Sequence, residues 1–136
     1  MSDVNKEIAR GLYRRLNEGD FSVVDEVISD DFVEHEAVPG IEQTKAGVRQ
    51  LFEMFHAAFD GASFEVDSMI GEGDKVVAMC RMTGVHKGEF MGIALSGQTI
   101  NVGAAEQFRF EDGKVVEHWG GMDSSALMQQ LAGAAH

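Results

Sequence analysis

One carboxylate interrupts an apolar alternation in the second half of the sequence. Between Thr99 and Phe110, every second residue on one face is apolar except Glu106; the apolar ones are Val102, Ala104, Phe108 and Phe110. If helices cover this face, Glu106 lies between apolar walls, where a carboxyl can be poised for proton transfer. A β-bulge, or a pairing of Glu106 with Arg81 or Arg109 at the sheet edge, would give it a structural role instead.

Two histidines occupy comparable positions on expected strands. His86 ends an apolar face that runs through Ala78 and Met82, and His118 lies in the last strand segment, where the pattern does not reveal which face is inside. An imidazole titrates near neutral pH, so each histidine can exchange a proton, or can instead be a hydrogen-bonded core or rim residue. We therefore treat Glu106, His118 and His86 as the candidate catalytic groups.

Motifs for metal, phosphate and nucleophilic chemistry are missing from the sequence. There is no H-x-x-x-H, H-E-x-x-H or C-x-x-C spacing, and neighbours in the run 34–36 (Glu-His-Glu) alternate between strand faces. Glycine-rich phosphate loops and a G-x-S-x-G elbow are also missing, and Cys80 falls mid-strand without a paired base. We expect no metal and no cofactor.

The elements that must position these groups change character about half-way along the chain. Helical spacing of apolar residues predicts helices over 4–16, 21–28 and 44–59, with a short extended piece at 31–35. From residue 62 the period becomes two, which predicts strands over 63–70, 76–87, 99–110 and 115–119, with 89–95 irregular or extended. Asp123 or Ser124 begins a last helix. This order predicts one α+β domain over residues 1–136.

The charge balance restricts the partners. With 23 Asp and Glu against 11 Lys and Arg, the net charge is −12, which repels phosphate backbones and anionic lipids. The longest apolar run is five residues, far short of the ~20 that a membrane span needs. The first residues are polar, without a secretion signal, and a single cysteine cannot form an internal disulfide. We expect a cytoplasmic protein that binds neither nucleic acid nor membrane.

Three segments, taken in order, carry a family resemblance. They are GVHKGEFMGI at 84–93, FRFEDGKVVEHW at 108–119 and DSSALMQQL at 123–131. They resemble the patterns G-T-H-x-G-x-F-x-G-I, F-R-F-x-D-G-K-I-x-E-x-W and D-x-x-x-L-x-x-Q-L of the SnoaL-like polyketide cyclases, in the nuclear-transport-factor-2-like superfamily. The likeness covers nearly the whole chain.

The resemblance implies a cone-shaped α+β fold. In this fold a strongly curved, mostly antiparallel sheet wraps around N-terminal helices and encloses a deep pocket, usually in a homodimer. Cyclases of the family close a ring in a polyketide methyl ester by intramolecular aldol condensation, with one acid/base group and without cofactor or metal. Carried over by position, the resemblance implies that Glu106 faces the pocket. A small apolar organic ligand would then contact His35, Phe52, Phe55, Met82, Phe108 and Trp119, with His86 and His118 nearby.

One departure from the family pattern leaves two hypotheses open. Many members carry the acid/base aspartate directly after the tryptophan, where this chain has Gly120, which cannot transfer a proton. The first hypothesis is a cofactor-independent lyase or isomerase for a small apolar carbonyl compound, with Glu106 or the pair of His86 and His118 as the replacement acid/base. The second is a non-catalytic protein that binds a small apolar ligand in the same pocket. Asp123 is expected to cap the last helix.

Overall fold

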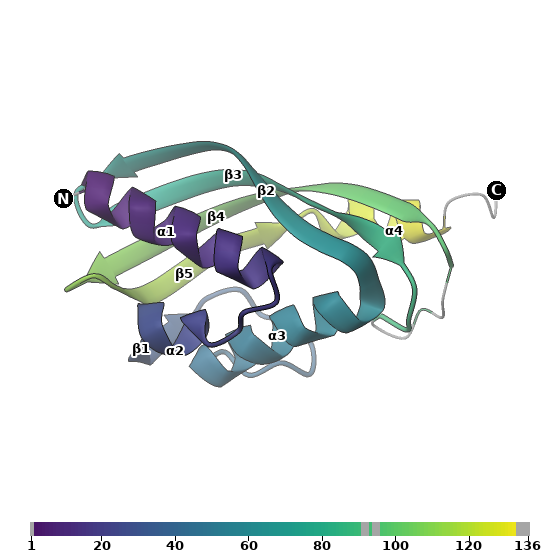
Figure 1. Cartoon of the computed structure of the whole chain (residues 1–136), viewed down its shortest axis with the longest axis horizontal. Helices are drawn as coiled ribbons and strands as arrows, with labels where there is room; N and C mark the ends of the chain where they lie inside the picture. The colour runs from purple at the N-terminus through teal and green to yellow at the C-terminus, as the bar shows by residue number, and fades with distance from the viewer. Residues whose placement is uncertain (1, 91–92, 94–95, 133–136) are drawn as a thin grey trace.

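The helical part of the chain supplies one wall of the domain. The computed structural model describes residues 2–90, 93 and 96–132 (Figure 1). Helix α1 (Ser2–Asn17) buries an apolar stripe that includes Leu12 and Leu16. Helix α2 (Val23–Val27) is a short turn, and α3 (Lys45–Ala58) begins after Thr44, whose Oγ1 accepts a hydrogen bond from the Gly47 N–H at 3.3 Å. The three helices expected from the apolar spacing are therefore present.

Five strands form a single mixed sheet in the order β1-β5-β4-β3-β2. The strands are β1 (Ile28–Glu34), β2 (Phe59–Glu72), β3 (Lys75–His86), β4 (Thr99–Glu111) and β5 (Lys114–Met122). All neighbours are antiparallel except β1 and β5, which run parallel. Helix α4 (Ser124–Ala132) follows β5, and Asp123 Oδ1 accepts a hydrogen bond from the Ala126 N–H at 3.1 Å, so Asp123 caps this helix as expected. This arrangement is an α+β fold.

Several strands are longer than the sequence pattern predicts. Ile28 and Phe59, expected at helix ends, have extended backbone and begin β1 and β2. Strand β5 continues three residues past Trp119 to Met122, because the longer β4 offers pairing partners there. Tertiary pairing thus overrides the local helical spacing at these boundaries. Of residues 89–95, positions 91–92 and 94–95 lie outside the described residues.

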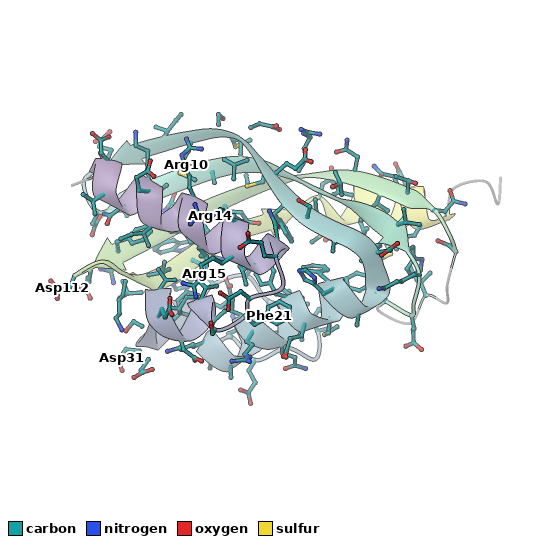
Figure 2. All side chains as sticks on the ribbon, viewed as in Figure 1. Arg10, Arg14, Arg15, Phe21, Asp31 and Asp112 are labelled. Carbon is teal, nitrogen blue, oxygen red and sulfur yellow. The ribbon has the colours of Figure 1, made fainter. Side chains whose placement is uncertain are left out.

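The core lies between the helices and one face of the sheet. Alternate residues of β3 and β4, such as Val76, Ala78, Val102 and Ala104, are buried together with the apolar stripe of α1. Figure 1 shows α1 lying across this face. Arg10 is one of the exposed side chains labelled in Figure 2. Among the described residues, no helix is both long and apolar enough to cross a membrane.

Candidate active site

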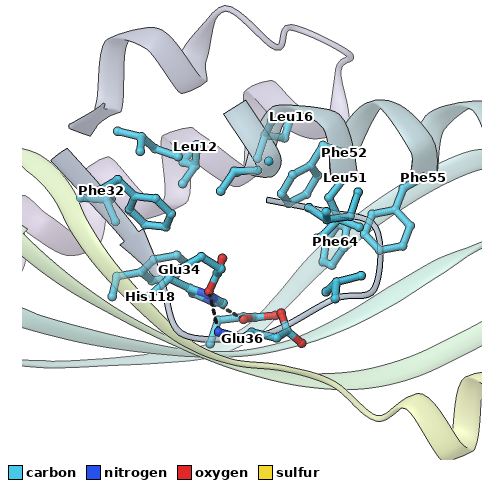
Figure 3. Close-up of a pocket in the computed structure, with 18 of the residues that line it drawn as sticks. Leu12, Leu16, Phe32, Glu34, Glu36, Leu51, Phe52, Phe55, Phe64 and His118 are labelled. Carbon is cyan, nitrogen blue, oxygen red and sulfur yellow. Dashed lines mark hydrogen bonds and ion pairs between the residues drawn. The ribbon is translucent and has the colours of Figure 1, made fainter. Parts of the chain in front are cut away.

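A pocket lies between the helices and the covered face of the sheet. Helices α1 and α3 and strands β1, β2, β4 and β5 all contribute to its lining, which is mostly apolar and includes Leu12, Leu16, Phe32, Phe52, Phe55 and Phe64 (Figure 3). Tyr13 also lines it, and burial raises the pKa of its hydroxyl, which therefore stays protonated at neutral pH. Such a pocket suits an apolar ligand held by a few polar groups.

The polar groups are concentrated around His118. The parallel pairing of β1 with β5 sets Glu34 beside His118, and the pairing of β5 with β4 sets His118 opposite Phe108, two residues along from Glu106. The imidazole donates from Nδ1 to Glu34 Oε2 and from Nε2 to Glu106 Oε2. Figure 3 labels His118 and Glu34 at the floor of the pocket. The side chains of His118, Glu34 and Glu106 are only 9%, 15% and 11% exposed. A buried carboxylate–imidazole–carboxylate cluster therefore faces the pocket.

This cluster holds His118 in its charged form. Burial by itself lowers the pKa of His118, but the hydrogen bonds and negative charges of Glu106 and Glu34 outweigh burial and raise it to about 10. At neutral pH the imidazole is therefore a cation with both N–H groups occupied. Among the described residues that line the pocket there is no lysine or arginine, so His118 supplies the positive charge of the pocket.

We expect the stability of the protein to fall in alkaline solution. The folded protein binds a proton on His118 more tightly than the unfolded chain, whose histidine has an ordinary pKa of about 6.5. The resulting stability is complete below about pH 6.5 and is lost as the pH rises through about 10. Urea unfolding at a series of pH values measures it. The control His35→Gln changes an exposed histidine and should keep the same decline in the free energy of unfolding. A wild-type free energy of unfolding that does not change between about pH 6.5 and 10 would contradict the raised pKa of His118.

Glu36 is a third carboxyl at the pocket. It lies in the segment between β1 and α3, and its carboxylate occupies the space beside Gly121 of β5. A Cβ atom on Gly121 would lie 1.6 Å from Glu36 Oε2, so only glycine leaves room for this carboxylate. Burial and the negative charges of Glu106 and Glu34, opposed by the charge of His118, raise the pKa of Glu36 to about 7.

Gly120 lies where the resemblance implies an aspartate. Its φ is +109°, and a Cβ atom there would lie 2.1 Å from the carbonyl oxygen of Ala105. The backbone of β5 therefore has no room for a side chain at this position. The polar groups of the pocket come from β1, from β4, from His118 and from the segment after β1.

The same residues have a spacing that could hold a metal ion. One oxygen each of Glu34 and Glu36 and one nitrogen of His118 lie within 4.8 Å of one another. Carboxylate and imidazole are ligands for several divalent metals. Both ring nitrogens of His118 are, however, hydrogen bonded to carboxylates, so a cation would have to displace one of these bonds.

The pocket brings together about half of the residues expected from the sequence. Glu106, His118, Phe52, Phe55 and Phe108 line it. The structural alternatives for Glu106 do not occur: Arg81 pairs with Glu65 and Asp67, and Arg109 with Glu117 and neighbouring acids.

The remaining expected residues lie elsewhere. Met82 is fully buried in the core and does not line the pocket. The rings of His35 and Trp119 stack on each other with centroids 4.7 Å apart, away from the pocket lining, and His35 Nε2 lies 2.7 Å from a Glu117 oxygen. These placements do not support direct ligand contact for Met82, His35 or Trp119. Trp119 follows His118 on β5 and therefore takes the opposite face of the strand, whereas Met82 is on the covered face but is enclosed by the core.

His86 is also outside the pocket lining. It is fully buried, packs against Phe59, and its Nδ1 accepts a hydrogen bond from the Ser96 N–H at 3.2 Å. Its Nε2 has no hydrogen-bond partner among the described residues. The geometry therefore fits a residue that anchors the connection between β3 and β4 and does not support direct proton exchange with a ligand in this pocket.

Two site residues, Glu34 and Glu36, were not among the predicted ones. The sequence feature that could have identified them is the run Glu-His-Glu at 34–36. If the extended segment predicted at 31–35 continues by one residue, Glu34 and Glu36 share one face and His35 lies on the other. The parallel neighbour β5 decides that the face with the two carboxyls is the inner one. Nothing local in the sequence indicates that pairing.

Comparisons with known proteins agree with the fold. The model of a family described as SnoaL-like polyketide cyclase matches residues 6–131. The chain is similar to TsrD of Streptomyces laurentii (28% identity, 95% of each chain covered, TM-score 0.86). It is also similar to AclR of Streptomyces galilaeus (30% identity, 97% of this chain and 98% of the other, TM-score 0.84). A third similar structure is IdmH of Streptomyces antibioticus (29% identity, 94% and 98%, TM-score 0.81). No curated protein sequence matches this chain.

Proposed function

This chain belongs to the SnoaL-like polyketide cyclase family, and on that basis we propose that it is a cofactor-independent enzyme for a small apolar carbonyl compound. In the proposed reaction a pocket group removes a proton from the carbon next to a carbonyl. The resulting enolate closes a ring by intramolecular aldol condensation or is reprotonated elsewhere, which isomerises the compound. The observation that carries the proposal is the buried cluster of Glu34, His118 and Glu106 in an otherwise apolar pocket.

The cluster favours catalysis over passive binding. Removing a carboxylate or an imidazolium from water is unfavourable by several kcal/mol per ion, and apolar side chains of similar volume are often as stabilising or more so. A protein that only holds an apolar ligand gains nothing from ions in its binding site. Charges fixed next to the reacting carbon, in contrast, stabilise the charge that develops in the transition state.

His118 would act on the enolate through its charge. Both of its N–H groups are hydrogen bonded to carboxylates, so it does not donate directly to a substrate oxygen. A cation in a low-dielectric pocket nevertheless stabilises a nearby enolate more strongly than it would in water. Glu34 and Glu106 then serve as positioning residues that keep the imidazole oriented and charged.

The size of the pocket supports a small substrate. The cavity volume is about 80 Å³, less than the ~150 Å³ of an engineered cavity that holds benzene. Larger ring systems would therefore require side chains of the lining to move. The cone-shaped curvature of the sheet and the homodimer that the resemblance implies are further parts of this proposal.

Hydrogen–deuterium exchange tests the proposed reaction without knowledge of the natural substrate. The protein is incubated in D2O with small aliphatic ketones and neutral β-keto esters, and deuterium at the carbon next to the carbonyl is followed by NMR. We expect wild-type protein to exceed the buffer rate for at least one compound, with and without EDTA. Binding of these compounds with exchange no faster than in buffer would contradict the enzyme and favour the non-catalytic binder.

Glu106→Gln is the matched variant for the role of His118. It keeps a hydrogen-bond acceptor for Nε2 but removes the charge that holds the imidazole protonated. The alkaline limb of the pH–rate profile, where the exchange rate falls as His118 loses its proton, should therefore move to lower pH. At pH 8 the rate should fall about 100-fold, as for loss of one transition-state donor. Glu53→Gln, an exposed position on α3, should match wild type. An unshifted alkaline limb in Glu106→Gln would contradict this role.

A further inference from the structure

We propose that Glu36 is the group that takes and returns the proton, from the space that Gly121 leaves open on β5. This inference rests on the proposed function, because it assigns the acid/base of that same reaction. The position where many family members carry the acid/base is Gly120, which has no room for a side chain. The required carboxyl would therefore come from the segment after β1 instead of from β5.

The contacts of the three carboxyls separate their roles. Glu34 and Glu106 each accept a hydrogen bond from His118, and these bonds fix them in place. No described residue donates a hydrogen bond to the Glu36 side chain, and only its backbone N–H is bonded, to Glu34 Oε2 at 3.2 Å. Glu42, the fourth carboxyl of the lining, is exposed and accepts a hydrogen bond from Thr44 Oγ1 at 3.4 Å. Glu36 is thus the half-buried pocket carboxyl whose oxygens remain available to a substrate, and one of them lies within 4.8 Å of a His118 nitrogen.

Gly121 makes this placement of the Glu36 carboxylate possible. A Cβ atom at residue 121 would meet both Glu36 oxygens, at 1.6 and 3.0 Å, and the carboxyl carbon at 2.4 Å. The φ of Gly121 is +144°, a conformation that L side chains rarely adopt. The carboxylate of Glu36 therefore occupies the position that the side chain of residue 121 would take.

The surroundings of Glu36 suit proton transfer near neutral pH. Its pKa of about 7 means that the ionised and protonated forms are both populated there, as a group that alternates between base and acid requires. The ionised Glu36 takes the proton from the carbon next to the carbonyl. The enolate carbon then bonds to a second carbonyl carbon of the same molecule, and the new alkoxide takes the proton back from Glu36. Substrate and product are isomers, and no co-reactant is consumed.

Glu36→Gln is the direct test in the exchange assay. The amide keeps the size of the side chain but cannot take a proton, so exchange should fall by about 10²- to 10⁴-fold. Affinity for the same ketone, measured by ligand-observed NMR, should be unchanged, as should the exchange rate of Glu53→Gln. If wild type exchanges and Glu36→Gln exchanges equally fast, this inference is overturned while the proposed function stands. If wild type does not exchange at all, both are overturned.

Two further measurements do not depend on turnover. Carboxyl-carbon NMR should show one glutamate that titrates near pH 7 in wild type and is missing from Glu36→Gln. The raised pKa means that ionisation of Glu36 is less favourable in the folded protein than in the unfolded chain. Wild-type stability should therefore decline between about pH 4.5 and 7, and Glu36→Gln should unfold at higher urea than wild type above pH 7.

The variant Gly121→Ala tests the position of the carboxylate, and it should abolish both the titration near pH 7 and the exchange. Gly103→Ala, where a Cβ meets nothing within 4 Å, should preserve both. A wild-type titration that survives in Glu36→Gln or Gly121→Ala would overturn the assignment.

Discussion

A chain that carries Gly120→Asp, which introduces the aspartate of many family members, is expected to lose stability and to gain no activity. The new Cβ would lie 2.1 Å from the Ala105 carbonyl oxygen, on a backbone with φ of +109°. Relief requires β5 to move away from β4 at the point where Gly120 pairs with Glu106. We expect a loss of about 3 to 5 kcal/mol in the free energy of unfolding, measured with urea.

Two controls separate the backbone clash from the new charge. Gly120→Ala should lose most of the same free energy, because the conflict is already present at Cβ. Gly103→Ala on the neighbouring strand β4 has open space and should be neutral or slightly stabilising. A Gly120→Asp protein that is as stable as wild type and exchanges substrate protons faster would show that the aspartate position is still usable.

His118→Gln is expected to destabilise the protein by about 3 to 5 kcal/mol at pH 8, because it leaves buried carboxylates without their cation. The two acids concerned, Glu34 and Glu106, are 15% and 11% exposed. Near pH 5 the loss should be smaller, since a carboxyl can then take up a proton in place of the missing charge. Urea unfolding at both pH values measures the difference.

Removal of the acids provides the matched control. In a background of Glu34→Gln and Glu106→Gln, replacing His118 should have a much smaller effect, because no unpaired charge is left behind. The same background should also lose the alkaline slope of stability. An equal loss from His118→Gln in both backgrounds would mean that packing, and not charge pairing, sets its contribution.

The sequence was sufficient to predict the class of fold and part of the site. Helical spacing and period-two alternation report which face of an element is apolar, and this is a local property. For the same reason the alternation around Glu106 indicated which apolar residues share its face, while the structure shows that this face is the covered one. Family motifs placed the chain in its family, which the match over residues 6–131 confirms.

Sequence reasoning failed where a position depends on a distant partner. His35 was expected at the ligand and instead stacks on Trp119, while its neighbours Glu34 and Glu36 face the pocket. The parallel contact of β1 with β5 joins segments that are more than 80 residues apart, and no local pattern encodes which face such a contact covers.

Gly120 and Gly121 show the same difference between what the sequence determines and what the tertiary structure decides. The sequence by itself determined that β5 has no acid at the family's usual position, because this needs only the identity of residue 120. Only the tertiary structure decided that the backbone there excludes any side chain and that a carboxylate from another segment occupies the space beside residue 121. The physical reason is that excluded volume and electrostatic coupling depend on distances through space. The pKa of Glu36 likewise follows from burial and from Glu106 and Glu34, which the fold brings to it.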